Sequence, residues 1–149
     1  MPESAAPSIV TIDGERIALG PERRDLVPLV QRWHNDFTAL RSLGDPPVPQ
    51  TLEQASAEYD HHATIPDMVR FLIYERATWR PIGLTLLHGI DYRQGTATYV
   101  ILIGEADCRG RGYGTEATRL MLDYAFTALG LHSVMLTTYS ISQGYVAVP

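Results

Sequence analysis

The sequence predicts a single α/β domain in which a mixed, mostly antiparallel sheet packs against helices. Three stretches with a period-two pattern of apolar residues, 68–75, 81–91 and 96–104, follow one another across short linkers. Linkers of hairpin size join antiparallel neighbours, so these stretches are expected to form a three-stranded meander. A helical pattern over 114–129 and a strand pattern over 133–139 come next. The predicted order of elements is β-α-α-β-β-β-α-β, a layered arrangement of helices on a sheet.

The N-terminal part of the chain supplies the first strand and two helices of that order. Residues 1–7 are small and polar, and we expect them to be disordered. Residues 8–21 predict a hairpin or a broken strand around an Asp-Gly turn. A helical pattern over 21–37 contains Pro28, which indicates a break or a late start. A second helix is expected over 51–63, which opens with the capping-box pattern TLEQ.

Composition and charge narrow the possible functions. The 149 residues fit one domain, 1–149, and the net charge of −5 makes nucleic acid an unsuitable partner. The first residues do not resemble a signal peptide, and no apolar run approaches the about 18 residues of a membrane span. Cys108 is the single cysteine, which excludes an intrachain disulfide and a cysteine-based metal site. We expect a cytoplasmic protein without membrane contact.

The stretch that points most directly to a function is RGRGYGT, residues 109–115, between the third meander strand and the following helix. The first turn of a helix has free N–H groups and a partial positive charge. Glycines let an anion approach that main chain, and arginines add donors for phosphate oxygens. The stretch has neither the Lys-Ser/Thr of a nucleotide P-loop nor the G-x-G-x-x-G of a dinucleotide-binding turn. It therefore predicts a pyrophosphate site of another kind.

The spacing Arg109-x-x-Gly112-x-Gly114 resembles the Q/R-x-x-G-x-G/A signature of the GNAT superfamily of acyl-CoA-dependent N-acyltransferases. The resemblance covers roughly residues 8–140 and is most specific over 96–139. It is strongest with the branch that acetylates ribosomal-protein N-termini and polyamines. The resemblance implies a GNAT-like fold, acetyl-CoA as co-substrate and an amine as acceptor.

The same resemblance assigns main-chain contacts to the coenzyme. In the family, a β-bulge splays the fourth strand from the next, and the pantetheine arm inserts between them. Here that strand edge would be Leu102, Ile103 and Gly104. The Leu102 amide would bind the thioester carbonyl as a small oxyanion site. The amides that would hold the pyrophosphate are those of Arg109, Gly110, Arg111, Gly112, Tyr113, Gly114 and Thr115.

The resemblance does not identify the general base. Family members often carry a glutamate at the position of Thr98, and a threonine cannot remove a proton at neutral pH. Glu105 and His88 are the catalytic candidates that we place first. Other candidates, each with a plain structural interpretation as well, are Asp91 and the cluster of Tyr59, Asp60, His61 and His62.

Five further side chains are interpreted without a catalytic or metal-binding role. Adjacent residues of a helix point about 100° apart, so the His61–His62 pair does not predict a metal site, and no metal is expected. Cys108 is not surrounded by a His-Asp pattern, and we interpret it as a loop residue. Trp33 and Trp79 are expected to fill the core.

The C-terminal stretch 140–149 departs from the family pattern. Family members have Asn-x-x-Ala and then a tyrosine that protonates the thiolate, whereas this chain has Ser142 and an oddly spaced Tyr145. The final helix and strands are therefore predicted to be missing, which would leave a sheet edge open. An open edge favours pairing with another chain, so we expect a homodimer, with exchange of a C-terminal strand as one route.

The predicted function is transfer of acetyl from acetyl-CoA to a primary amine by direct attack. The acceptor is left open among a polyamine, an aminoglycoside-like compound and a protein N-terminus. The alternative is a non-catalytic CoA-binding or dimerisation remnant of such an enzyme. Thr98 and the missing tyrosine favour that alternative.

Overall fold

The computed structural model describes residues 7, 9–40, 48–138 and 144–148. The predicted disorder of residues 1–7 concerns a segment that lies outside this part, apart from residue 7. Among the described residues, no helix is both long enough and apolar enough to cross a membrane.

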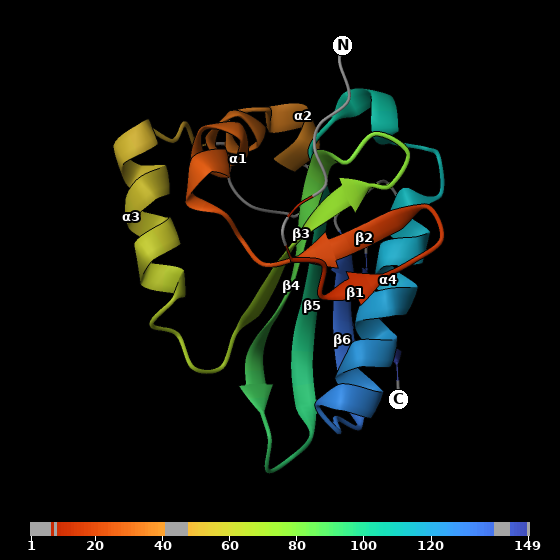
Figure 1. Ribbon diagram of the computed structural model, residues 1–149. Helices are drawn as coiled ribbons and strands as arrows, with labels where there is room; N and C mark the ends of the chain where they lie inside the picture. The colour runs from red at the N-terminus through yellow and green to blue at the C-terminus, as the bar shows by residue number, and fades with distance from the viewer. Residues whose placement is uncertain (1–6, 8, 41–47, 139–143, 149) are drawn as a thin grey trace.

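Seven strands form one sheet in the described part of the chain (Figure 1). They are β1 (Ile12–Asp13), β2 (Ile17–Gly20), β3 (Val69–Glu75), β4 (Arg80–Asp91), β5 (Thr96–Ile103), β6 (Ser133–Thr138) and β7 (Gly144–Val148). They lie side by side in chain order, and each is antiparallel to its neighbour except β6, which is parallel to β5. The predicted meander, now β3–β4–β5, and the mixed, mostly antiparallel sheet are confirmed.

Helices cover both faces of the sheet (Figure 1). They are α1 (Val27–His34), α2 (Phe37–Leu40), α3 (Leu52–His62) and α4 (Tyr113–Asp123), with short 3₁₀ turns at Arg24–Leu26 and Ala106–Cys108 and a π-helical turn at Tyr124–Ala128. The first three gather on one face, and α4 lies along the other.

The starts of α1 and α3 follow the sequence signals. The late start of α1 is confirmed, because Pro28 lies in its first turn, where the missing N–H costs no helical hydrogen bond. The capping box of α3 is confirmed as well. The Thr51 hydroxyl accepts from the Gln54 N–H at 3.1 Å, and the Gln54 side chain accepts from the Thr51 N–H at 2.8 Å.

The sheet separates two apolar cores. On one face, Met121 of α4 packs in a cluster that includes Tyr99 of β5. On the other, Trp33 of α1 packs with Leu84 of β4 and Leu102 of β5. Side chains alternate between the faces of a strand, so the odd-numbered residues of β5 face α4 and the even-numbered ones face α1. This assignment decides below which candidate residues share a face.

The C-terminal part corrects one expectation. A strand was not predicted beyond residue 139, yet β7 pairs antiparallel with β6 from Val134–Val148 to Thr138–Gly144. The expected open edge at β6 is therefore wrong, because the chain's own β7 covers it. The place of the expected final helix, including Ser142, lies outside the described residues. Tyr145 lies within β7.

A close contact between Trp33 and Gly104 joins α1 to the end of β5. The Trp33 side chain is 1% exposed, and a Cβ added at Gly104 would lie 2.3 Å from its ring atoms. The indole Nε1 also donates to the Glu105 carboxylate at 2.6 Å. The position needs a glycine because the buried ring occupies the space of a side chain.

The substitution Gly104→Ala is expected to lower the free energy of unfolding by about 1–3 kcal/mol, since overpacking of a buried ring costs that much. Chemical denaturation measures it. Gly114→Ala is the matched control, because its added Cβ would meet Ile101 and Ile103 at an ordinary 3.9 Å. Equal stability of the two variants would contradict the assigned contact.

Candidate active site

One segment of β5 has a neighbouring strand on one side only. The pairing with β6 covers Thr96 to Tyr99, whose partners are Ser133 to Leu136. Beyond Tyr99, β6 departs from β5 and continues its pairing with β7. The main chain of residues 100–103, which we call the open segment, is therefore unpaired on the β6 side of the described sheet. The splay implied by the family resemblance is thus present.

The splay occurs without the implied bulge. The register between β4 and β5 runs without a shift from His88–Thr98 to Gly83–Ile103. The register shift of this pair of strands lies instead at the other end, between His88 and Asp91. The open segment consequently keeps the regular alternation of an antiparallel strand.

That alternation decides which main-chain groups face the gap. The Gly104 N–H donates to the Ile82 carbonyl of β4 at 2.8 Å, and the Val100 carbonyl accepts from the Thr85 hydroxyl of β4 at 3.1 Å. Both even-numbered positions thus turn their polar groups toward β4. Odd-numbered residues turn theirs to the opposite side, as alternation requires.

The prediction for Leu102 is corrected by this geometry. Leu102 pairs with Leu84, and its N–H points toward β4 rather than into the gap. The Gly104 N–H is directed toward β4 as well. The amides on the open side are those of Ile101 and Ile103. Of the three predicted edge residues, Ile103 alone presents its N–H there.

The glycine-rich turn adjoins the open segment. Gly110 and Gly112 have φ angles of +73° and +81°, a region that favours glycine. Gly112 is the N-cap of α4, and no side chain caps this helix end. The free N–H groups of the first turn, which include those of Tyr113, Gly114 and Thr115, therefore remain for an anion.

The two arginines of the turn differ in what they contact. Arg109 Nε donates to the Ile103 carbonyl at 2.9 Å, and its Nη2 donates to the Gly104 carbonyl at 3.1 Å. The same guanidinium lies 3.4 Å from Asp36, so Arg109 holds the loop together. Arg111 is 52% exposed and lies 3.5 Å from Glu75, which leaves its guanidinium accessible to an anion.

Beneath the turn, Glu75 and Cys108 are buried. Glu75 accepts from the Tyr113 hydroxyl at 2.7 Å and from the Thr78 hydroxyl at 2.8 Å, and these bonds lower the pKa of its carboxyl. Burial raises the pKa of the Cys108 thiol. Its Sγ accepts from Arg80 at 3.3 Å. A buried thiol with a raised pKa is a poor nucleophile, which agrees with its interpretation as a loop residue.

Glu105, the first catalytic candidate, is engaged by three side chains. Its carboxylate accepts from Arg32 and from the indole of Trp33, and Arg80 lies 3.7 Å away. The carboxylate is 16% exposed. These three neighbours occupy the carboxylate oxygens. The geometry makes Glu105 a tie between α1 and the end of β5.

His88, the second candidate, has a different environment. It pairs with Thr98 across β4 and β5, and alternation puts both on the face that α1 covers. The His88 side chain is half-buried and makes no hydrogen bond or ion pair to any described residue. The residue lies directly opposite Thr98, the position where the family often has a glutamate.

The other candidates are structural. Asp91 accepts from the N–H groups of Arg93 and Gln94, both at 3.0 Å, and so closes the β4–β5 turn. In the α3 cluster, Arg24 pairs with Asp60 and lies over the ring of Tyr59 at 4.8 Å. The described residues contain no group of acidic, histidine and cysteine side chains able to hold a metal ion.

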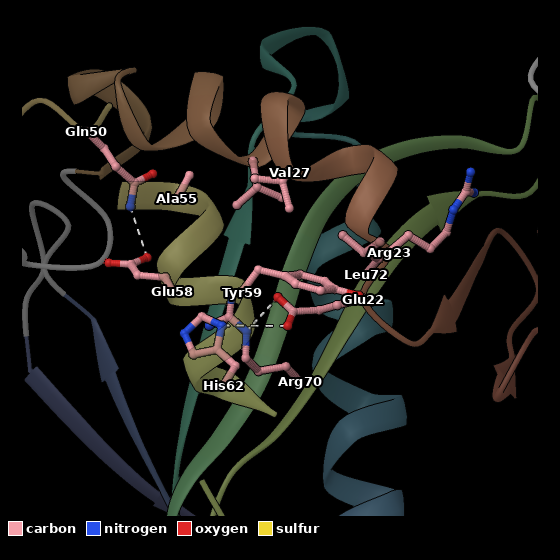
Figure 2. Close-up of a pocket in the computed structure, with 11 residues that line it drawn as sticks. Glu22, Arg23, Val27, Gln50, Ala55, Glu58, Tyr59, His62, Arg70 and Leu72 are labelled. Carbon is pink, nitrogen blue, oxygen red and sulfur yellow. Dashed lines mark hydrogen bonds and ion pairs between the residues drawn. The ribbon is translucent and has the colours of Figure 1, made fainter. Parts of the chain in front are cut away.

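A cavity lies between α1, α3 and β3 on the α1 face (Figure 2). Glu22 is at its centre, 2.8 Å from Arg70 and 3.6 Å from His62. Burial raises the pKa of Glu22, but the bonds to His62 and Arg70 outweigh it and leave the pKa lowered. Glu58 on the opposite wall accepts from Gln50 at 2.9 Å.

A second hollow adjoins this cavity along β3. It shares Glu22, His62 and Arg70 with the cavity and reaches Met68. Met68 precedes Val69, the partner of Leu87.

Several residues of this region could not be predicted from the sequence. Glu22 and Arg70 lie 48 positions apart, and only the sheet brings them together. Arg16 is a further example, since it contacts the glycine-rich turn from the β1–β2 hairpin. Trp33, by contrast, could be predicted, because it is an aromatic residue on the apolar side of a predicted helix.

Similar proteins share the sequence pattern. The chain is 28% identical over 130 residues to human alpha/beta-tubulin-N-acetyltransferase 9, and 27% identical over 120 residues to spermidine N(1)-acetyltransferase of Escherichia coli K12. These matches cover 79% and 80% of this chain. The chain spans 62% of the length of each relative.

Solved structures share the fold. Spermidine N-acetyltransferase from Vibrio cholerae, in complex with CoA and spermine, superposes with a TM-score of 0.75 at 23% identity, covering 83% of this chain and 71% of that one. An acetyltransferase from Bacillus anthracis gives a TM-score of 0.71 at 17% identity, covering 85% and 72%. The model of the acetyltransferase (GNAT) domain matches residues 16–148, and the chain therefore belongs to the GNAT acetyltransferase family.

Proposed function

We propose that this protein transfers an acetyl group from acetyl-CoA to a primary amine by direct attack. The observation that carries the proposal is the open segment of β5, which leads directly into an uncapped helix N-terminus. An extended pantetheine arm needs a strand edge with free polar groups, and a pyrophosphate needs free amides beside it. Residues 100–103 and 109–115 meet these two requirements.

The residues present fit the coenzyme. Gly110 and Gly112 have positive φ angles and no side chains, so this turn exposes its main chain. The amides from Arg109 through Thr115 would bind the pyrophosphate, with Arg111 adding an exposed guanidinium. Ile101 and Ile103 would bind the arm through their open-side main chain, and one of these N–H groups would stabilise charge on the thioester oxygen.

His88 is the base that the contacts favour. An attacking ammonium must lose a proton before its nitrogen can reach the thioester carbon. His88 has no partner among the described residues and stands opposite Thr98, whereas Glu105 is held by Arg32 and Trp33. Imidazole is the side chain that most often serves as a general base in enzymes.

The acceptor would enter through the cavity between α1 and α3. Glu22 and Glu58 in its wall attract a cation, while Arg70 and Arg23 oppose that attraction. The mixed charge admits an amine without selecting a polycation over a peptide N-terminus. The named activities of the relatives, on spermidine and on tubulin, support both classes as acceptors to test.

The proposal on the coenzyme is tested by thermal denaturation. Acetyl-CoA at ~100 times its Kd is expected to raise the Tm by about 5 °C or more. Gly112→Asp should abolish the rise, because its carboxylate repels the pyrophosphate. Gly112→Asn, which adds a side chain of the same shape without the charge, should lose less of the rise than Gly112→Asp. No rise in the unmutated protein, with CoA or acetyl-CoA, would sink the assignment.

The base is tested by thiol release from acetyl-CoA with a panel of polyamines, aminoglycosides and peptides. With an amine that reacts, His88→Gln should lower kcat by about 100-fold or more. His61→Gln, at an exposed histidine of α3, is the control and should leave kcat unchanged. A Glu105→Gln variant that loses this activity while His88→Gln keeps it would reverse the two roles.

Coenzyme binding without turnover across that panel would favour the non-catalytic alternative. Homodimer formation, cytoplasmic location and independence from metal are also part of the proposal. Light scattering tests the first of these. The spermidine N-acetyltransferase from V. cholerae, which has been solved as a dodecamer, shows that this fold can assemble in that protein.

A further inference from the structure

The β1–β2 hairpin contacts the glycine-rich turn from outside the family motif. Arg16 lies between the two strands, and its Nη2 donates to the main-chain carbonyl of Arg111. Its guanidinium carbon lies 4.6 Å above the ring of Tyr113. A Cβ on Gly112 would come within 3.2 Å of Arg16 Nη1. One arginine thus touches three consecutive residues of the turn.

Glu116 of α4 fixes the hairpin in this position. Its carboxylate is buried, with the residue 6% exposed, and accepts from the N–H groups of Arg16 at 2.9 Å and Ile17 at 3.1 Å. A Cβ on Gly14 would lie 2.5 Å from the same oxygen, so the turn before Arg16 is packed against the carboxylate. Charge-assisted bonds to two main-chain donors hold the hairpin firmly to the first turns of α4.

The contact with the Arg111 carbonyl has a geometric consequence. A trans peptide unit is planar, and its C=O and N–H point in opposite directions. When Arg16 holds the Arg111 carbonyl on the hairpin side, the Gly112 N–H must point away from the hairpin. Among the described residues, that N–H has no acceptor. The contact therefore presents a free amide at the helix N-terminus.

We propose that Arg16 is a positioning residue of the coenzyme site, which orients the Gly112 amide toward the pyrophosphate by holding the Arg111 carbonyl. This inference rests on the proposed function, since the anion is that of CoA. A bond from a guanidinium to a carbonyl also polarises the peptide unit and strengthens its N–H as a donor. The positive charge of Arg16 offsets the buried Glu116 carboxylate, which would otherwise repel the anion at short range.

The test is a CoA titration followed by calorimetry and by the NMR shift of the Gly112 amide. Arg16→Gln is expected to raise the Kd for CoA about tenfold, the usual size of one lost charge-assisted bond. The downfield shift of the Gly112 amide on CoA binding should shrink. Arg16→Lys, which keeps a cation and a donor, should recover part of both, and the KM for acetyl-CoA should rise without a matching fall in kcat.

Arg76→Gln is the matched control. Arg76 contacts the same hairpin through the Gly14 carbonyl at 3.0 Å but does not touch the turn. It should alter stability without altering the Kd or the Gly112 shift. The inference is overturned if Arg16→Gln binds CoA like the unmutated protein, or if Arg76→Gln weakens binding equally. Absence of CoA binding in the unmutated protein would instead overturn the proposed function on which the inference rests.

Discussion

The departure of β6 from β5 after Tyr99 is the constraint on which the site depends. A parallel pair of strands has to part for the main chain of 100–103 to be reached from the side. The loss of hydrogen bonds at that point is limited, because this part of β5 stays paired with β4 and β6 is paired with β7. The sheet can therefore hold a gap between two strands that are each secured on their other side.

The rest of the structure fixes the end of that gap. Trp33 packs on Gly104 and donates a hydrogen bond to Glu105, and these contacts join α1 to the strand end. On the opposite face, Glu116 holds the β1–β2 hairpin against α4. The strand end, the turn and the start of α4 are thus supported from both faces. Catalytic geometry requires this kind of support, because small displacements of main-chain donors cost much of their effect.

Local patterns explain what could be predicted from the sequence. The period-two stretches gave the meander, and the spacing of Gly112 and Gly114 located the turn. The YVAV run of β7 also has residues typical of a strand. A strand was not predicted there because this segment departs from the family's usual ending. The direction of the Leu102 amide could not be predicted, since it depends on a register that shifts by one with any bulge. Arg16 and Glu116 are in contact although they lie 100 positions apart in the sequence, and a local pattern cannot predict such a contact.

The guanidinium of Arg109 has a consequence for the molecule when no coenzyme is bound. Unpaired strand edges invite pairing with strands of other chains, which leads to aggregation. By covering the Ile103 carbonyl, Arg109 removes an acceptor from the exposed side of the open segment. The remaining unpaired main chain of the open segment is too short to pair with a strand from another chain, since stable pairing needs several successive hydrogen bonds. The charge at this corner thus opposes aggregation by strand pairing at this edge, while the inner part of the gap stays accessible.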